Sequence, residues 1–414
     1  MSGRGKQTGA PVREAASMSQ ANHEVAKEEE EVKPSDGSKR IKLDIPKEKR
    51  EESPERSSPL FHKEKRTSWW LVSEGSLFGV GNPLLDIAVN TDSEYLKKYE
   101  LEPNNAILAE KKHEPMYKEM AGMAGVEYLA GGATQNSMRV AQWILRKKHC
   151  ATFMGSVGKD SFSKTLEEKA EEAGVKVRYQ KQDDHPTGTC AVVITKNGAC
   201  RSLVANLAAA NHFSKSHLDV PENKALLEKA KFYYISGFFL TVSPETIQTI
   251  GKHACEHNKV FSMNLSAPFL CEHFKKPMMA AFPYIDILFS NETEAAKFSE
   301  VQGFGLTDIR EIALKTASLP KENEKRSRIV VFTQGADNVI LAKDGKVKEF
   351  PVVRLPEEKL IDTNGAGDAF VGGFLAQLVQ GRDVADCIKC GIWAATEIIQ
   401  RSGCTFPPDL RYED

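Results

Sequence analysis

The stretch DTNGAGDAFVGGFL, residues 362–375, places four glycines and two aspartates at one junction between a strand and a helix. Glycine lets a chain turn tightly and lets main-chain amides approach a ligand closely. Amides at a helix start carry partial positive charge and bind phosphate well. The stretch lacks the lysine and hydroxyl of the G-x-x-x-x-G-K-[ST] phosphate loop and has Asp368 at the helix start instead. We interpret Asp368 as a base that deprotonates a hydroxyl beside an anion hole.

The four glycines have two expected roles. Gly365 and Gly367 lie in the turn itself, where a ligand role is favoured. Gly372 and Gly373 lie inside the helix, where close packing of that helix is the favoured interpretation. The helix is predicted to turn one apolar face toward a sheet, formed by Phe370, Phe374 and Leu378.

Composition bounds the function. The chain has 414 residues, enough for one large or two ordinary domains, and a net charge of −1. Such a balance gives no global field that favours nucleic acid, membranes or acidic substrates. No secretory signal is visible at the start, and no apolar run approaches the ~20 residues of a membrane span. Cys387 and Cys390 form one C-x-x-C pair within a helical pattern and without a second pair, so we expect reduced, intracellular thiols rather than zinc or a redox motif.

The first part of the chain differs from the rest. Residues 1–70 are rich in charged residues, Ser and Pro, and we predict a disordered tail because they cannot bury enough surface to offset their ordering entropy. Within 38–50, SKRIKLD and PKEKR resemble a short basic nuclear-import signal, with an ordinary solvated charge run as the alternative. A location in nucleus and cytoplasm and an import receptor as partner follow as expectations.

Residues 77–414 are predicted to form an α/β domain. Short apolar runs alternate with helical patterns at 244–258 and 292–303, which is typical of a large, doubly wound, mostly parallel sheet flanked by helices. The runs occupy 77–89, 231–237, 259–266, 285–291 and 328–335. Ligands of open α/β sheets bind beyond the carboxyl ends of the strands. The polar residues expected there are Asn264, Asn291, Glu294, Thr333, Gln334, Gly335 and Asp362.

A second, smaller sheet is predicted from about 86–130 and 183–210. Strand patterns at 86–92, 105–110, 187–198 and 200–211 are joined by polar turns, and a small antiparallel sheet is the economical arrangement. Laid over one end of the large sheet, it would act as a lid that excludes water when substrate binds. A glycine turn at 131–132 opens an amphipathic helix up to residue 145.

Several blocks together resemble one known family. They are GNPLLD (81–86), AGGATQNS (130–137), PTGTC (186–190), RSLVANLAAAN (201–211), GFFLTVSPE (237–245), NLSAPF (264–269), NETEA (291–295), FTQG (332–335) and DTNGAGDAFVGGFL. In order, from about residue 77 to 407, they are similar to the ribokinase-like (phosphofructokinase-B) family of carbohydrate and nucleoside kinases. DTNGAGD alone specifies the family, and the blocks near 82, 131, 201 and 264 resemble members that take adenosine as acceptor. The tail is not covered.

The resemblance implies a ribokinase-like fold and a role for each of several residues. Asp368 would be the base that activates the ribose 5'-hydroxyl, and Arg201, from the lid, would balance charge on the transferring phosphoryl group. The anion hole for the γ-phosphate would comprise Asn364, Gly365, Ala366 and Gly367. The sugar would be held by Asp86, through its 2'- and 3'-hydroxyls, with Asn82, Gly132 and Asn136. The adenine would be walled by Leu84, Leu203, Ala205, Phe238 and Phe269.

The resemblance also implies cofactors. ATP would lie along Thr333 and Gly335, and Asn291 with Glu294 would organise Mg²⁺ largely through water. A monovalent cation near the anion hole is possible in this family, and these residues do not decide it. We expect a monomer. Each role has a plain structural alternative: a turn residue for Asp86, a surface charge for Arg201, core side chains for Phe238 and Phe269, and helix caps for Asn291 and Asp368.

Some positions depart from the pattern of relatives that use adenosine. Ala106 stands where they usually carry Gln, Ala133 where they carry Ser, and Ile392 where His is often near the nucleotide; 195–200 is lengthened. We expect these changes to affect affinity more than activity. The leading hypothesis is an ATP-dependent, Mg²⁺-requiring adenosine 5'-phosphotransferase that makes AMP and ADP in purine salvage. The alternatives are a kinase of another nucleoside or a sugar, and a weakly active relative that acts as a nuclear interaction protein.

Overall fold

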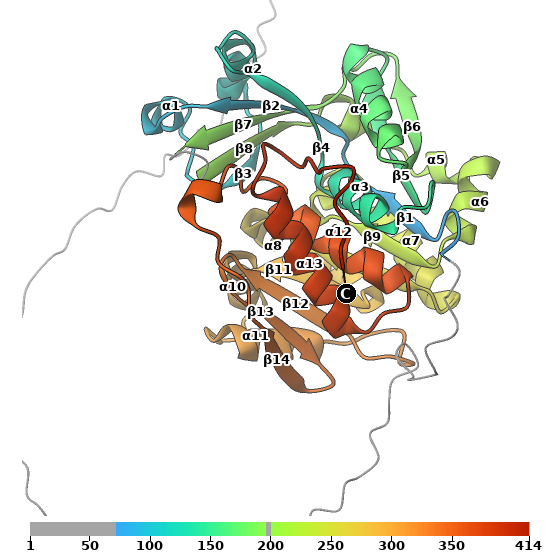
Figure 1. Cartoon of the computed structure of the whole chain (residues 1–414). Coiled ribbons are helices and arrows are strands. Elements are labelled where there is room, and N and C mark those ends of the chain that lie inside the picture. Colours follow the sequence, from blue (N-terminus) through green and yellow to red (C-terminus); the bar gives the residue numbers. More distant parts are fainter. Residues whose placement is uncertain (1–71, 196–199, 414) are drawn as a thin grey trace, which may run out of the picture. The chain divides into compact units, whose positions relative to one another are not determined.

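The computed structural model describes residues 72–195 and 200–413, and two β-sheets organise this part of the chain (Figure 1). The predicted tail at 1–70, its basic segment at 38–50 and most of the 195–200 stretch lie outside the described residues. Within the described part, no helix is both long and apolar enough to cross a membrane.

The larger sheet has the strand order β14-β13-β12-β11-β10-β9-β1-β5-β6. Strands from β12 to β6 run parallel, whereas β13 and β14 add antiparallel pairings at one edge. The strands are β1 (Leu77–Val80), β5 (Ala151–Gly158), β6 (Lys176–Gln182), β9 (Phe232–Ile235), β10 (Val260–Asn264), β11 (Ile287–Asn291), β12 (Ile329–Gln334), β13 (Asp337–Lys343) and β14 (Lys346–Phe350). The predicted large, mostly parallel sheet is confirmed.

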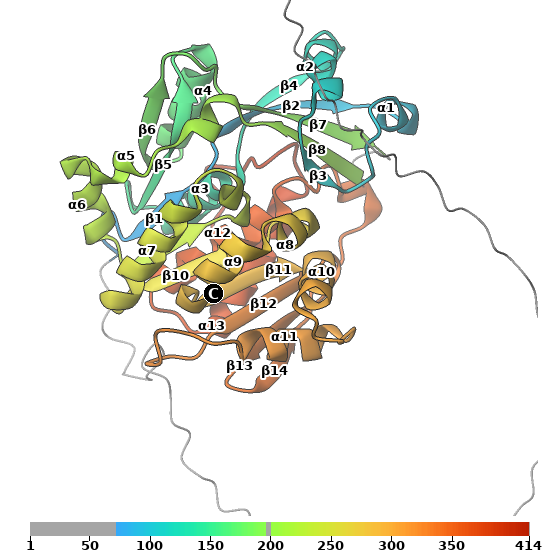
Figure 2. The same cartoon turned by 180° about the vertical axis from the view of Figure 1, so that it is seen from behind.

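Helices cover both faces of this sheet because its strands are apolar on both sides. On β9, Tyr233 and Ile235 pack into one core layer and Tyr234 packs into the other. The first layer, in front in Figure 2, contains α5 (Ser216–Asp219), α6 (Pro221–Lys229), α7 (Pro244–Glu256), α8 (Pro268–His273), α9 (Lys275–Ala281), α10 (Glu292–Gln302) and α11 (Ile309–Ala317). The second layer, in front in Figure 1, contains α3 (Ala133–Leu145), α4 (Ser161–Glu172), α12 (Ala366–Val379) and α13 (Val384–Ile398). Short turns η1 (Lys111–His113), η2 (Ala208–His212), η3 (Gly237–Thr241), η4 (Phe282–Tyr284) and η5 (Glu357–Lys359) join these elements.

Helix α12, which follows the glycine-rich turn, is buried on every side from Ala369 to Val379. The predicted apolar face toward the sheet is confirmed, since Phe370, Phe374 and Leu378 lie in the second core layer and the two rings contact Phe289 of β11. The other sides of the helix are buried as well, because α3 and α13 pack against it. The packing role of the two later glycines is confirmed. A Cβ on Gly372 would lie 2.6 Å from the Val140 Cβ on α3, and a Cβ on Gly373 would lie 2.6 Å from the main-chain oxygen of Cys390 on α13.

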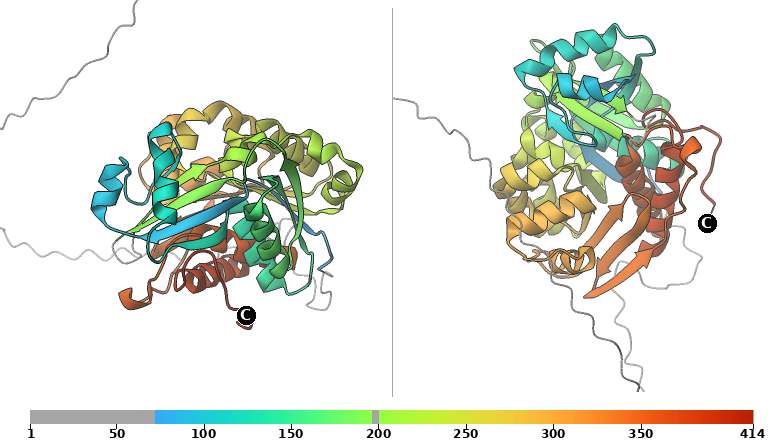
Figure 3. Two further views of the ribbon diagram at one scale, coloured as in Figure 1. Left: turned by 90° about the horizontal axis from the view of Figure 1, so that it is seen from above. Right: turned by 90° about the vertical axis from the view of Figure 1, so that its left-hand side faces the viewer.

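The smaller sheet has the order β3-β8-β7-β2-β4 and covers one end of the larger sheet (Figure 3). Its strands are β2 (Leu84–Asn90), β3 (Ala106–Leu108), β4 (Glu127–Gly131), β7 (Thr189–Thr195) and β8 (Cys200–Asn206). Helices α1 (Ser93–Lys98) and α2 (Glu114–Ala121) pack on its outer face. Its inner face, on the side opposite to α1 and α2, carries Leu84 and Ala88.

The prediction that the smaller sheet is antiparallel is wrong in part. The pairs β2–β4 and β7–β8 are antiparallel, but β2–β7 and β3–β8 are parallel. Parallel neighbours need a long connection, and the chain between β2 and β7 passes through β5 and β6 of the larger sheet before it returns. The sequence patterns also did not predict β4, β5, β6, β13 or β14.

Candidate active site

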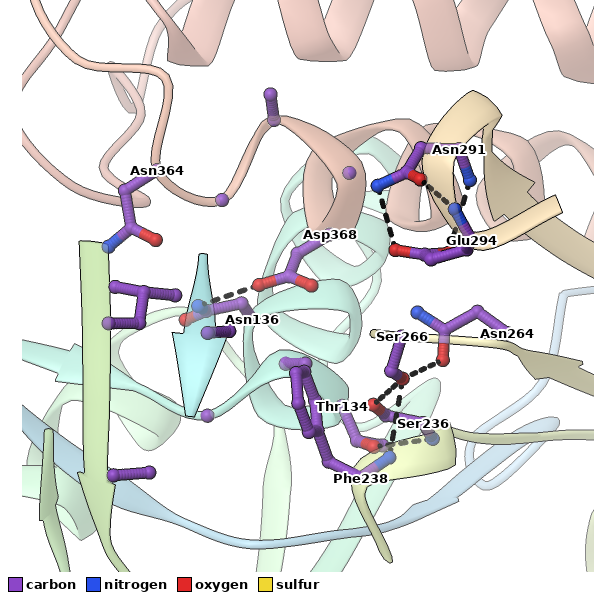
Figure 4. A pocket seen from close by; sticks show the side chains of 18 of the residues that line it. Thr134, Asn136, Ser236, Phe238, Asn264, Ser266, Asn291, Glu294, Asn364 and Asp368 are labelled. Carbon is purple, nitrogen blue, oxygen red and sulfur yellow. Dashed lines mark hydrogen bonds between the residues drawn. The ribbon is translucent and has the colours of Figure 1, made fainter. Parts of the chain in front are cut away.

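A cavity of about 660 Å³ lies where the carboxyl ends of the large-sheet strands meet the inner face of the smaller sheet. Of the polar residues expected only at the strand ends, Asn264 lines this cavity, whereas Gln334 and Asp362 are not among its lining residues. Every residue to which the resemblance assigned a role lines it, and Figure 4 shows several of them. These residues are Asn82, Leu84, Asp86, Gly132, Asn136, Arg201, Leu203, Ala205, Phe238, Phe269, Asn291, Glu294, Thr333, Gly335, Asn364, Gly365, Ala366, Gly367 and Asp368.

Asp368 lies in the first turn of α12, after Gly365, which has the left-handed φ of +74° at the helix cap. Its Oδ2 accepts a hydrogen bond from Asn136 Nδ2 at 3.0 Å (Figure 4). Burial raises the pKa of Asp368 to about 7, and the bond from Asn136 opposes that rise. Because Gly365 occupies the cap position and the Asp368 carboxylate faces the cavity, the helix-cap alternative for Asp368 is not supported.

The turn before α12 is held by two hydrogen bonds to Asp362 and by a close approach to Cys404. A Cβ on Gly367 would meet no atom within 4 Å, and Gly367 lines the cavity, whereas the Ala366 amide donates to the Thr363 oxygen at 3.3 Å. A Cβ on Gly365 would lie 2.9 Å from the Cys404 Cβ. The buried carboxylate of Asp362 accepts from the amides of Asn364 at 2.6 Å and Gly403 at 2.7 Å. This turn can therefore present main-chain N–H groups to an anion.

Asp86 lies on β2 and not in a turn, so the turn alternative is wrong. Side chains alternate along the strand, so Asp86 shares the inner face with Leu84 and Ala88. Burial raises its pKa to about 7; Asn364, whose Nδ2 donates to Asp86 at 3.4 Å, opposes the rise, and the Asp368 charge adds to it. A Cβ on Gly131 would lie 2.1 Å from the Asp86 Oδ1, so a glycine is required beside this carboxylate.

Arg201 lies on β8 and is only 6% exposed, so the surface-charge alternative is wrong. Its guanidinium is ion-paired with Asp362. Within the described residues none of its three nitrogens has a hydrogen bond of good geometry, so the guanidinium keeps donors for another anion. Burial lowers its pKa to about 10, and the Asp86 charge opposes this.

One end of the cavity is apolar. Leu84, Leu203 and Ala205 come from the smaller sheet, whereas Phe238 (η3) and Phe269 (α8) come from the first helix layer. The two rings have centroids 6.4 Å apart and are tilted by 40°. Both are half-buried and pack against the core while they line the cavity, so the core and ligand interpretations hold together. Such walls suit a flat aromatic base.

The opposite end is polar. Asn291 caps α10, and Glu294 completes a capping box by accepting from the Asn291 amide at 3.1 Å and from Nδ2 at 2.8 Å. The cap alternative is confirmed, and both residues also line the cavity. Burial raises the pKa of Glu294 to about 7. Among the described residues, no three His, Cys, Asp or Glu side chains are close enough to form a metal cage.

Asp362 was predicted at the end of a strand beside the ligand, but it lies on no strand: it is in the segment between η5 and α12, where it organises the turn before that helix. Arg139 on α3 had no assigned role in the sequence-based predictions; it donates to the side chain of Asn136 at 3.4 Å. One signal for Arg139 was available in the sequence: it is a charged residue three positions after Asn136. The helix that contains both is buried from Thr134 to Trp143.

The three departures lie in different places. Ala106 and Ala133 line the cavity, whereas Ile392 packs against the second core layer from α13 and is not among the cavity-lining residues.

Comparison with known proteins agrees with this geometry. Residues 99–410 match the model of the pfkB family of carbohydrate kinases. Adenosine kinase 2 of Arabidopsis thaliana is 55% identical over 339 residues, which is 81% of this chain and 98% of that protein. The chain belongs to the pfkB family, in its adenosine kinase branch.

Solved structures of the same branch are also similar. Anopheles gambiae adenosine kinase in complex with P1,P4-di(adenosine-5) tetraphosphate has a TM-score of 0.80 and 53% identity, over 83% of this chain and 100% of that one. Schistosoma mansoni adenosine kinase in complex with 2-fluoroadenosine has a TM-score of 0.78 and 36% identity, over 81% of this chain and 98% of that one. The ribokinase-like fold expected from the sequence is thus confirmed.

Proposed function

We propose that the protein transfers the γ-phosphoryl group of ATP to the 5'-hydroxyl of adenosine, giving AMP and ADP in purine salvage. One observation carries the proposal: a buried carboxylate, Asp368, lies in the first turn of α12 beside the glycine turn at Gly365 to Gly367, in a cavity that also contains Asp86. Relatives in this branch form complexes with 2-fluoroadenosine and with P1,P4-di(adenosine-5) tetraphosphate.

The chemistry follows from these residues. Asp368 takes the proton of the 5'-hydroxyl. At the same time the hydroxyl oxygen forms a bond to the γ-phosphorus, and the bond between that phosphorus and the leaving ADP oxygen breaks. The amides from Gly365 to Gly367 and the guanidinium of Arg201 stabilise charge on the phosphoryl oxygens. Asp86, with Asn82, Gly132 and Asn136, holds the ribose so that the hydroxyl stays within reach of Asp368.

Other residues of the cavity surround the adenine of the acceptor and the donor nucleotide. Leu84, Leu203, Ala205, Phe238 and Phe269 wall the adenine of the acceptor, and Thr333 and Gly335 border the donor nucleotide. The smaller sheet excludes water from this reaction, because hydrolysis of the donor would compete with transfer.

Magnesium fits the polar end of the cavity. Asn291 and Glu294 supply hard oxygen atoms there, the ligand type that Mg²⁺ prefers, and this ion usually keeps several of its waters. We propose that these two residues hold Mg²⁺ through water. The ion would neutralise charge on the donor phosphates.

The contacts of Asp362 do not call for a monovalent cation. Its two oxygens already accept from main-chain amides, and Arg201 balances its charge. We also propose a monomer, because one chain supplies every residue of the site.

The test is phosphorylation by the purified protein with ATP and Mg²⁺ across adenosine, inosine, guanosine and ribose. We expect adenosine to have the highest kcat/KM. Preference for inosine, guanosine or ribose would favour the alternative of another acceptor. Turnover no faster than that of an Asp368→Asn protein would favour the weakly active relative, for which Ala106 and Ala133 in the cavity wall are the supporting observation.

A further inference from the structure

Arg139 is a buried cation behind the cavity wall that the proposed chemistry does not use. It is 7% exposed, lies on α3 and is not among the residues that line the cavity. Its Nη1 donates to Asn136 Oδ1 at 3.4 Å, to the main-chain oxygen of Ala130 at 3.4 Å and to that of Cys404 at 3.3 Å. Its guanidinium lies 5.4 Å from the centroid of the Phe406 ring. Arg139 thus joins the end of β4, helix α3 and the C-terminal segment.

The contact with Asn136 matters most, because Asn136 lies between two charged groups. Its Nδ2 donates to the Asp368 carboxylate at 3.0 Å, and its Oδ1 accepts from Arg139. An asparagine amide can turn over and exchange its donor and acceptor ends. The guanidinium of Arg139 can only donate, so it opposes the orientation in which the amide oxygen would face Asp368.

We propose that Arg139 is a positioning residue of the phosphoryl transfer: it fixes the Asn136 amide with its N–H toward the Asp368 carboxylate. The inference rests on the proposed role of Asp368 as the base. Arg139 touches no reacting atom, so its contribution passes through Asn136.

The surroundings of Asp368 give this orientation a measurable consequence. The charged or titratable groups around it are Asp86 from the smaller sheet, Tyr234 from β9, Cys404 from the C-terminal segment, and Arg139 behind Asn136; Arg201 lines the same cavity. The bond from Asn136 lowers the pKa of Asp368. Loss of that bond raises this pKa, so the acid limb of the rate profile moves to higher pH.

The test compares Arg139→Met with a matched control, Arg146→Met. Arg146 ends the same helix, and its guanidinium also donates to carbonyls of the C-terminal segment, those of Pro408 and Leu410, but it does not contact Asn136. With adenosine and ATP, Arg139→Met should lower kcat by about 10-fold to 100-fold, since a misplacement of about 1 Å can cost on the order of 100-fold. The acid limb of kcat should move to higher pH. Arg146→Met should stay within about twofold of the parent with an unmoved limb.

Two further variants show whether Arg139 acts by positioning Asn136 or only by stabilising the fold. If Arg139 acts through Asn136, the double variant Asn136→Ala with Arg139→Met should be no slower than Asn136→Ala alone. Arg139→Lys keeps the charge but loses the planar fork, so it should show a smaller shift of the limb in the same direction. If thermal unfolding shows that Arg139→Met does not fold, Arg139→Lys replaces it in the pH measurement.

An unmoved acid limb in both Arg139 variants, or losses that simply add in the double variant, would overturn the inference. A parent that phosphorylates adenosine while the Arg139 variants match Arg146→Met contradicts this inference alone. A parent without activity on adenosine contradicts the proposed function, and this inference falls with it.

Discussion

At the scale of single residues, three carboxyl groups in one cavity share an unusual state. Burial raises the pKa values of Asp86, Glu294 and Asp368 to about 7, far above those of exposed carboxyl groups. A buried carboxylate destabilises the fold when it ionises, since desolvation disfavours its charge. Three such groups in one cavity lower the stability of the fold, which agrees with the ligand roles proposed for them.

Replacement of the base gives the first prediction. Asp368→Asn should lower kcat by roughly 10²–10⁴-fold, the typical contribution of general-base catalysis. In the parent, kcat/KM should rise with pH through about 7, as the coupled pair Asp86 and Asp368 ionises. Initial rates between pH 5.5 and 9 measure both effects. A variant that keeps more than about a tenth of the parent rate would remove Asp368 from the mechanism.

The same variant should be more stable than the parent, and increasingly so as pH rises. The folded pKa of Asp368 is raised above its unfolded value of 3.8, so the folded parent binds more protons and loses stability as pH rises toward 7. Between pH 5 and pH 8 this amounts to ~3 kcal/mol, since the effect grows over about two pH units, up to the folded pKa, and one unit corresponds to about 1.4 kcal/mol. Denaturant unfolding at the two pH values checks it, and an advantage independent of pH would contradict the raised pKa.

The second prediction concerns Asp86. Its replacement by Ala should weaken adenosine more than 2'-deoxyadenosine, because the carboxylate serves a hydroxyl that the deoxy compound lacks. A lost hydrogen bond to a charged group costs roughly 1.5–3 kcal/mol. The ratio of kcat/KM for the two nucleosides, in parent and variant, measures this effect. Equal losses for both would show that Asp86 does not hold the 2'-hydroxyl.

At the scale of elements, the site depends on how closely α12 approaches α3. Asp368 and its partner Asn136 lie on these two helices, 3.0 Å apart at their nearest polar atoms. Gly372 permits that approach, since a Cβ there would lie 2.6 Å from the Val140 Cβ and 2.8 Å from the main-chain oxygen of Ser137.

The third prediction tests this helix contact. Gly372→Ala should lower the free energy of unfolding by about 1–3 kcal/mol, the typical cost of overpacking, and should lower kcat by separating Asn136 from Asp368. Gly122→Ala is the control: Gly122 has a right-handed helical backbone, and its nearest atom to an added Cβ would be 3.5 Å away. The control should keep the parent rate. Full stability and activity in Gly372→Ala would show that the two helices can move apart freely.

At the scale of the whole molecule, the described residues that line the cavity all come from the kinase domain. The lining runs from Gly81 to Val371. The fourth prediction is that a protein lacking residues 1–68 keeps kcat and KM within about twofold, since changes away from a site rarely exceed ~0.5 kcal/mol. Steady-state kinetics of the full and shortened chains decide it. A large kinetic change would connect this segment with the active site.

The fifth prediction concerns location, which we propose to be both nucleus and cytoplasm. The segment 38–50 contains two basic clusters, made of Lys39, Arg40 and Lys42 and of Lys47, Lys49 and Arg50. Replacement of these six residues by Ala in a fluorescent fusion should move protein from nucleus to cytoplasm, because an import receptor reads such clusters. An unchanged distribution would leave the clusters as an ordinary solvated charge run.

The sequence alone determined the features that short-range chemistry controls. The glycine turn with Asp368, the buried strands and their polar ends were readable because local spacing and residue type dictate them. The resemblance of the ordered blocks then assigned the remaining residues, and all of them line one cavity.

Only the tertiary structure decided the pairings between distant segments. The parallel pairs of the smaller sheet arise because the chain returns from the larger sheet before it forms β7. The burial of α12 on all sides, the ion pair between Arg201 and Asp362, and the contact of Arg139 with Asn136 follow from packing of elements far apart in sequence. Strand direction, desolvation and charge pairing depend on residues that are distant in sequence and close in space. The periodicity of the sequence does not identify those residues.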